Sequence, residues 1–365
     1  MDRAGGIVGI SFSFVLGIAL GTHLSAHAPL PVKSLILSTI CASACASVLI
    51  IIFSDRCKIW QIPLLFLLLG SLCSLGDSLR EGVLQTMGRG RLDDWAEALK
   101  NLIDALPMRH GESNALMKAL VSGDRSSLSK STLDAFRAAG ASHILALSGM
   151  HLGIIYMLLR RPLGLLGGST VSRVLSFSTI VGAAGLFTAV TGAGASLNRA
   201  FLFILIAEIG KLMPERRAKL ANTYSAALTI QLALDPQVIL NVGFQLSYLA
   251  MAGIVFLLPS MQKWFPQDSR KPGLTARMWN VMALSLSCQI FTAPAVWYYF
   301  HSFPTYFLLT NLLAMPLTTA AMSTAVICLG LSALGVCPGI LVQICDVCFQ
   351  ALIFTVSTIG GLSSS

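Results

Sequence analysis

Long apolar segments recur along almost the whole chain. A helix needs about twenty mostly apolar residues to cross a bilayer, and about eleven segments approach that description. They cover residues 5–24, 34–53, 59–76, 142–159, 171–191, 194–213, 219–234, 236–259, 279–300, 305–335 and 337–360. The 305–335 segment is too long for one straight span, so we expect Pro316 to break it or part of it to be re-entrant. The pattern predicts an all-α, polytopic membrane helix bundle with about eleven transmembrane helices.

The composition agrees with this prediction. Only 11% of the 365 residues are charged, and 55% are apolar, whereas a soluble domain has about 25% charged residues. Lipid can face apolar side chains directly, so a membrane bundle does not need the missing polar surface. The composition therefore argues against a soluble catalytic domain.

One segment differs from the rest. Residues 77–141 hold nine basic and nine acidic side chains, so the formal net charge of +9 lies outside this segment. An apolar stripe with helical spacing runs from Asp93 to Leu106 and stops before Pro107. Shorter helical stretches cover 114–121 and 131–139. We therefore divide the chain into N-terminal transmembrane helices (1–76), a helical extracytoplasmic insertion (77–141) and a transmembrane core (142–365).

Basic residues gather in alternate turns between the apolar segments. They are Arg56 and Lys58; Arg160, Arg161 and Arg173; Lys211, Arg216, Arg217 and Lys219; and Lys263, Arg270, Lys271 and Arg277. The other turns hold almost none, apart from Lys33. Because cytoplasmic turns are rich in Lys and Arg, the N-terminus is predicted to be cytoplasmic and the insertion external.

Polar side chains inside spans are costly and point to function. His143, Ser148 and His151 lie together at the start of the 142–159 segment. Ser148 and His151 are three residues apart, and Gly149 permits a close helix contact. These residues suit hydrogen bonding between helices. The alternative is an intramembrane serine hydrolase using Ser148, although its histidine base would normally come from another helix.

Two further segments carry ionisable groups. Arg199 follows a glycine-rich stretch at 191–195 that suits a tight turn or a broken helix beside a cavity. Its guanidinium suits phosphate contact, or it snorkels to the membrane surface. Glu208 does not share a helix face with Arg199. Asp235-Pro236 has the pattern of a helix N-cap followed by proline. An ion-coupled small-solute transporter using Glu208 or Asp235 is another alternative.

No pattern indicates a metal or cofactor. The sequence has no Walker-type loop and no cluster of metal-ligating His and Asp residues. Most of the nine cysteines lie in apolar segments, and Cys345-x-x-Cys348 has no second pair. We therefore expect no metal, no cofactor and no ATPase activity, so any energy would come from a partner or a gradient.

Five ordered motifs resemble the ComEC competence protein family. They are 121–128 (VSGDRSSL), 142–151 (SHILALSGMH), Asn198-Arg199-Ala200, Asp235-Pro236 followed by 242–248 (VGFQLSY), and Ala293-Pro294 followed by 298–300 (YYF) and 311–316 (NLLAMP). The resemblance implies a non-enzymatic channel that carries single-stranded DNA across the bacterial cytoplasmic (inner) membrane during natural transformation. It also implies an extracellular DNA receptor and a cytoplasmic helicase or ATPase as partners, besides membrane lipid. The oligomeric state stays open, a homo-oligomer included.

Residue roles follow from this resemblance and from the chemistry of the side chains. The predicted DNA path or gate comprises His143, Ser148, His151, Arg199, Asp235 and Gln245. Arg199 and the histidines would contact phosphates, whereas Ser148 and Gln245 would join helices. Predicted structural motif positions are Gly123, Asp124, Arg125, Gly149, Pro236, Gly243, Phe244, Pro294, Asn311 and Pro316. Tyr248, Trp297, Tyr298 and Tyr299 would stack on bases or anchor the helices at the membrane interface.

The chain also differs from larger members of that family. Those members carry a small β domain before the core, where this sequence has helical patterns. Many of them end in a metallo-β-lactamase-like domain, which this sequence does not contain up to Ser365. We therefore expect a short form without nuclease activity.

Overall fold

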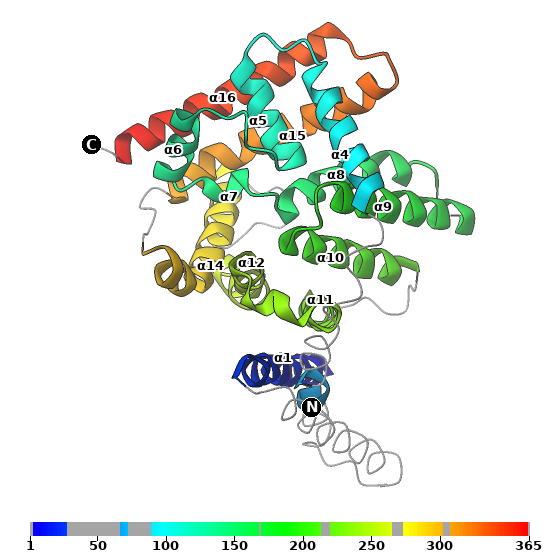
Figure 1. Cartoon of the computed structure of the whole chain (residues 1–365), viewed down its shortest axis with the longest axis vertical. Coiled ribbons are helices and arrows are strands. Elements are labelled where there is room, and N and C mark those ends of the chain that lie inside the picture. The colour runs from blue at the N-terminus through cyan, green and yellow to red at the C-terminus, as the bar shows by residue number, and fades with distance from the viewer. Residues whose placement is uncertain are drawn as a thin grey trace. The chain divides into compact units, whose positions relative to one another are not determined.

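A computed structural model describes residues 3–27, 66–71, 89–167, 169–212, 220–264, 273–301 and 307–363. Within these residues every regular element is a helix and no strand occurs, which confirms the all-α prediction (Figure 1). The chain divides into two compact units. The first comprises residues 1–88 and 213–248, and the second comprises residues 89–212 and 249–365.

The first unit is built around α1 (Arg3–His27) and α11 (Leu220–Leu234), which pack against each other. The Ser11 hydroxyl donates to the carbonyl of Ser225 at 3.2 Å. Gly17 of α1 lies directly against the backbone of Leu67, where no side chain would fit. The 3-10 helix η1 (Pro236–Leu240) and the start of α12 (Val242–Ala252) complete the described part of this unit.

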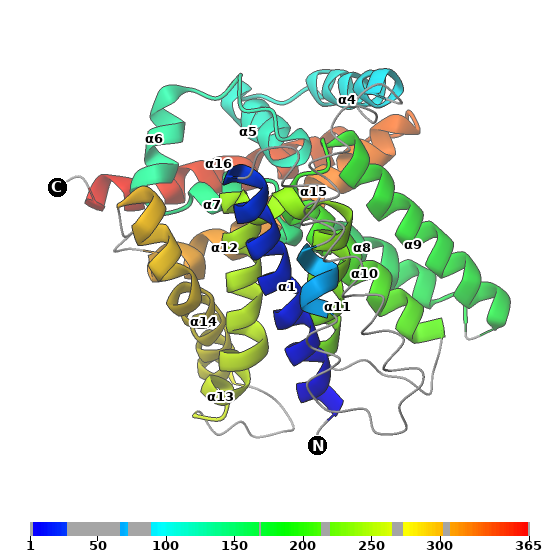
Figure 2. The ribbon, with the colours of Figure 1, turned by 60° about the horizontal axis from the view of Figure 1, so that its bottom comes forward.

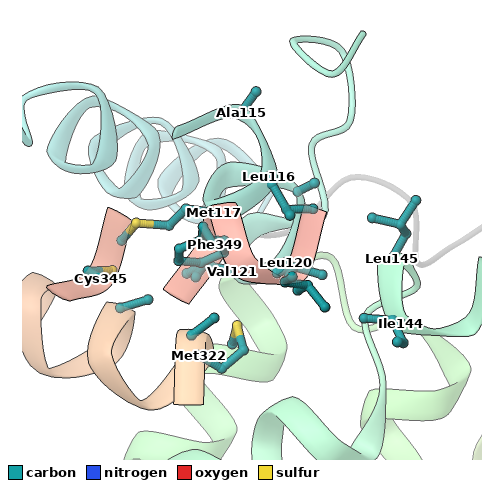
Figure 3. Close-up of a cluster of buried hydrophobic side chains, with 14 of the residues drawn as sticks. Ala115, Leu116, Met117, Leu120, Val121, Ile144, Leu145, Met322, Cys345 and Phe349 are labelled. Atoms are coloured by element: carbon teal, nitrogen blue, oxygen red, sulfur yellow. The ribbon is translucent and has the colours of Figure 1, made fainter. Parts of the chain in front are cut away.

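Three amphipathic helices open the second unit: α4 (Arg89–Asp104), α5 (Gly111–Ser122) and α6 (Lys130–Ala138). They confirm the helical character predicted for this part of the insertion. Leu116 and Leu120 of α5 are fully buried in a cluster with side chains of α15 (Phe307–Ala333) and α16 (Gly339–Ser363) (Figure 3). Phe136 of α6 is fully buried in the same cluster. The described part of the insertion, residues 89–141, is therefore a packed part of the second unit.

Helices α8 (Gly149–Gly164), α9 (Thr170–Val190) and α10 (Ala195–Leu212) pack together as a group. The predicted glycine-rich turn joins α9 to α10. Gly192 and Ala193 both have positive φ there, at 85° and 49°. The Asn198 side chain donates to the Ala193 carbonyl at 2.8 Å and closes the turn.

The rest of the second unit runs from the end of α12 to the C-terminal part of the chain. It comprises the π-helical turn η2 (Gly253–Leu257), α13 (Leu258–Gln262), α14 (Leu274–Phe300), α15 (Phe307–Ala333) and α16 (Gly339–Ser363). α15 and α16 pack along each other, and Figure 2 shows them running across the direction of α14. The hydrogen bond between His110 and Asp346, 2.8 Å long, ties the start of α5 to α16.

Three predicted segments differ from the structure. The 142–159 segment is two helices, α7 (Ser142–Leu145) and α8, separated by extended residues. The 236–259 segment starts as a 3-10 helix and becomes α-helical only at Val242. α15 continues through Pro316 without a break, because neighbouring helices in an apolar environment can accommodate a proline.

Five described helices are long and apolar enough to cross a membrane. They are Thr170–Val190, Val242–Gln262, Met278–Phe300, Phe307–Ala333 and Gly339–Leu362. The predicted segment 34–53 lies outside the described residues, and only 66–71 of the segment 59–76 are described. The total of about eleven spans therefore stays a prediction.

Candidate functional site

The candidate site is centred on the break between α7 and α8. Ser148 has an extended backbone, with φ −125° and ψ 166°, and α8 begins at the next residue. The backbone N–H of Ser148 donates to Nδ1 of His151 at 3.0 Å, whereas the Ser148 hydroxyl lies 3.4 Å from the same nitrogen. The fully buried His151 thus caps the start of α8. The expected continuous helix through Ser148 and His151 is wrong, since the helix starts between them.

Arg199 reaches this helix start from α10. Only 8% of Arg199 is exposed. A Cβ added to Gly149 would lie 3.3 Å from Nη2 of Arg199 and 3.2 Å from Cβ of Ala200, so the glycine allows the close approach. The first N–H groups of a helix lack intrahelical acceptors and carry partial positive charge. A guanidinium beside them creates a strongly electropositive spot that suits an anion.

The insertion holds the α7–α8 connection in place. Arg125 donates to the Leu145 carbonyl from both Nε (3.2 Å) and Nη2 (2.8 Å). Gly123 has φ 82° at the end of α5, and a Cβ there would lie 2.7 Å from Cδ1 of Leu147. Only glycine satisfies both the backbone angle and the contact without strain. The 121–128 motif therefore shapes the chain just before Ser148.

Asp124 of the same motif is paired with Lys100 of α4. Nζ of Lys100 lies 2.7 Å from Oδ2 of Asp124, and the backbone N–H of Ser126 donates to Oδ1 at 3.0 Å. The hydrogen bond from Lys100, followed by those from Ser126, holds the pKa of the Asp124 carboxyl well below its usual range. Lys100 thus anchors the motif to α4, the first described helix of the insertion.

We expect this pair to stabilise the insertion above about pH 4, the pKa of an unfolded aspartate. Because the folded pKa of Asp124 is lowered, the stabilisation is lost as the pH falls below that value toward the folded pKa. Lys100→Gln should reduce this pH-dependent part, although the hydrogen bonds from Ser126 remain, and should lower stability by less than about 1 kcal/mol at neutral pH, since the pair is partly exposed. Thermal unfolding between pH 3 and 7 measures it. If the stability of the wild type and of Lys100→Gln fell in parallel as the pH is lowered, the assigned role of the Lys100–Asp124 pair would be contradicted.

The start of α15 also meets this region. The Thr310 hydroxyl donates to the Ala139 carbonyl at 2.7 Å. His143 is exposed, and its Nδ1 lies 3.1 Å from the Gly140 carbonyl oxygen. α15 also packs against α8. The motifs at 121–128, 142–151, 198–200 and 311–316 therefore come together in one unit. That meeting depends on contacts between segments far apart in the chain.

The other predicted path residues lie in the first unit. Asp235 is exposed at the N-cap position of η1 and Pro236 follows it in the first turn, as predicted, but the Asp235 side chain makes no capping hydrogen bond. The Gln245 side chain donates to the Ile239 carbonyl at 2.8 Å and joins η1 to α12. Phe244 is buried against the ring of Tyr248, with ring centroids 4.6 Å apart. These contacts give the motif a local structural role within its own unit.

The aromatic candidates separate into two groups. Tyr248 is buried and its hydroxyl donates to Gln231 at 3.0 Å, so its ring is not available for stacking on a base. Trp297, Tyr298 and Tyr299 are exposed near the end of α14. Pro294 is an exposed proline inside the same helix. Only the α14 aromatics thus remain as stacking candidates.

Sequence reasoning missed a polar cluster around Glu208. Glu208 is only 2% exposed. It accepts hydrogen bonds from the Tyr156 hydroxyl (2.9 Å), Lys211 (2.6 Å) and Arg160 (3.4 Å). The i, i+3 spacing of Glu208 and Lys211 was a visible signal, but the partners on α8 were not. Among the described residues, no group of His, Cys, Asp and Glu is placed to hold a metal ion.

Apolar helices of spanning length, packed around buried polar groups, define a polytopic membrane protein. A model of the Competence protein family matches residues 120–365. The chain belongs to this family, which confirms the resemblance found in its motifs. The matched region also covers the four motifs that meet around the start of α8.

Two curated relatives extend the comparison. The chain is 28% identical over 213 residues to "ComE operon protein 3" of Bacillus subtilis (strain 168), a match that covers 57% of this chain and 25% of that protein. It is 25% identical over 212 residues to "Uncharacterized protein YcaI" of Escherichia coli (strain K12), covering 56% of this chain and 27% of that protein. The matches thus span about a quarter of each relative. No solved structure matches the chain.

Proposed function

We propose that this chain forms a membrane channel through which single-stranded DNA reaches the cytoplasm during natural transformation. Membership of the Competence protein family supports a role in DNA uptake. The observation that carries the proposal is the buried Arg199 beside the first turn of α8. A buried guanidinium beside a helix N-terminus suits contact with a DNA phosphate that crosses the apolar membrane core.

Single-stranded DNA also requires surfaces on which bases can stack. The exposed rings of Trp297, Tyr298 and Tyr299 offer such surfaces in the same unit as Arg199. In this proposal the chain itself is not an enzyme and lies in the bacterial inner membrane, with the N-terminus in the cytoplasm. An extracellular receptor delivers the DNA, and a cytoplasmic helicase or ATPase draws it inward.

The test compares Arg199→Ala with Arg199→Lys in the source bacterium. Labelled duplex DNA is added, and the nuclease-protected label inside the cell is measured. We expect Arg199→Ala to lower uptake about tenfold or more, because one charge-assisted phosphate contact is worth roughly that factor. Arg199→Lys should restore part of it, since it keeps the charge but not the planar fork.

Arg137→Ala is the matched control, because Arg137 is an exposed arginine of α6 that pairs only locally with Asp134 among the described residues. All variants are compared at equal abundance in the membrane. DNA should still bind outside the cell when Arg199 is changed. Normal uptake by Arg199→Ala at equal abundance would refute the proposed role of this residue, and normal uptake after deletion of the gene would refute the channel.

A further inference from the structure

Two cations converge on one buried carboxylate between α8 and α10. Nζ of Lys211 lies 2.6 Å from Oε1 of Glu208, and Nη1 of Arg160 lies 3.4 Å from Oε2. The Glu208 side chain is 3% exposed, whereas those of Arg160 and Lys211 are 41% and 40% exposed. The carboxylate neutralises only one of the two positive charges. It therefore holds two partly exposed cations in place and leaves an excess positive charge at the surface.

More positive charge lies at the same end of this helix group. α8 ends at Gly164 and α9 begins at Thr170, so a short turn joins the end of one helix to the start of the next. Arg161 and Arg173, both exposed, flank this turn. Among the described residues at this end of α8, α9 and α10, four basic side chains therefore accompany one acidic side chain, Glu208, and their excess positive charge suits an anionic group.

Large apolar side chains near the end of α8 and the start of α9 are also exposed. They are Met157 (51%), Leu165 (87%), Leu166 (54%), Val171 (78%), Val174 (51%) and Leu175 (53%). A nucleic-acid surface would instead offer exposed aromatic rings for stacking. The one aromatic residue of the cluster, Tyr156, has Lys211 over its ring at 5.2 Å and donates its hydroxyl to Glu208. The surface therefore combines a cationic centre with a rim for hydrocarbon chains.

We propose that this end of α8, α9 and α10 is a binding site for an anionic phospholipid. Arg160 and Lys211 contact the phosphate of the headgroup, and the aliphatic rim contacts the acyl chains. α9 is long and apolar enough to cross a membrane, and its first turn lies at this site, as expected for a headgroup site at the bilayer boundary. The proposal does not depend on DNA transport.

The test uses the full chain, purified in detergent and stripped of lipid. Thermal unfolding is followed while phosphatidylglycerol, or phosphatidylcholine with the same acyl chains, is added. We expect phosphatidylglycerol to raise the Tm at lower concentrations than phosphatidylcholine. In the double variant Arg160→Gln/Lys211→Gln, the half-saturating concentration of phosphatidylglycerol should rise about tenfold or more, given the contribution of each basic residue near an anionic headgroup.

The matched control is Lys130→Gln/Arg137→Gln, which removes two charges from exposed residues of α6. It should respond to phosphatidylglycerol like the wild type. If the first double variant does not fold, Arg161→Gln/Arg173→Gln serves instead, because it leaves the contacts of Glu208 intact and should still weaken the response several-fold.

Two soluble ligands distinguish the source of the phosphate. Glycerol phosphate has the headgroup chemistry without acyl chains and should stabilise only at far higher concentration. A single-stranded oligonucleotide should not compete with phosphatidylglycerol. Equal stabilisation by either soluble ligand would overturn the lipid assignment, as would an unchanged response of the variants that lack the cations.

Discussion

Replacing Gly253 by alanine is expected to separate the helices that pack at η2. A Cβ at this position would overlap the carbonyl oxygen of Ser287 and lie 2.8 Å from its carbonyl carbon. Both atoms belong to the backbone of α14, so no side-chain rotation can relieve the clash. We expect a loss of about 3 kcal/mol or more in the free energy of unfolding.

Three hydrogen bonds depend on this close approach. The Trp279 indole donates to the Met261 carbonyl at 3.1 Å, the Ser287 hydroxyl to the Met261 sulfur at 3.2 Å, and the Cys288 thiol to the Ala250 carbonyl at 3.7 Å. Denaturant unfolding in detergent measures the change. The control is Gly330→Ala in α15, where a Cβ would meet nothing within 4 Å. It should be neutral or slightly stabilising, and equal stability of the two variants would contradict the prediction.

The helical segments were predictable because helix formation depends on the local pattern of apolar residues. The insertion shows this best. The apolar side chains of Leu99, Leu102, Ile103 and Leu106 recur at helical spacing, and α4 contains the first three of them. α9 and α14 likewise fall close to their predicted segments. Uniformly apolar segments carry no such internal signal. The breaks before Gly149 and at Asn241 were therefore missed, because apolar residues continue across both.

Candidate site residues were predictable one by one, but their arrangement was not. Ser148, His151 and Arg199 were singled out because polar groups in apolar segments are unusual. Their contact requires α10 to pack on the start of α8, and the bond from Arg125 to Leu145 requires the insertion to fold back. Such long-range contacts leave no periodic trace in a single sequence. The role of these residues in a DNA path stays a prediction.

The second large effect is expected at His151. His151→Ala removes the acceptor for the Ser148 N–H and leaves a cavity where a fully buried ring had packed. The loss of the cap and the cavity together should lower the free energy of unfolding by about 2–4 kcal/mol. His151→Asn should recover part of this loss, because its amide oxygen can accept the same N–H. Unfolding in detergent measures both variants.

Ser148→Ala separates this capping role from the hydrolase alternative. The start of α8 is a capping box in which the backbone N–H of Ser148 donates to Nδ1 of His151 and the Ser148 hydroxyl faces the backbone N–H of His151. We therefore expect Ser148→Ala to lose about 1 kcal/mol and to support DNA uptake near the wild-type level. If Ser148 were instead a catalytic nucleophile, Ser148→Ala would keep the stability of the wild type and lose the hydrolytic activity. If Ser148→Ala alone abolished uptake while its unfolding matched the wild type, the capping role could not account for the motif, and the hydroxyl would have to act in the DNA path or in catalysis.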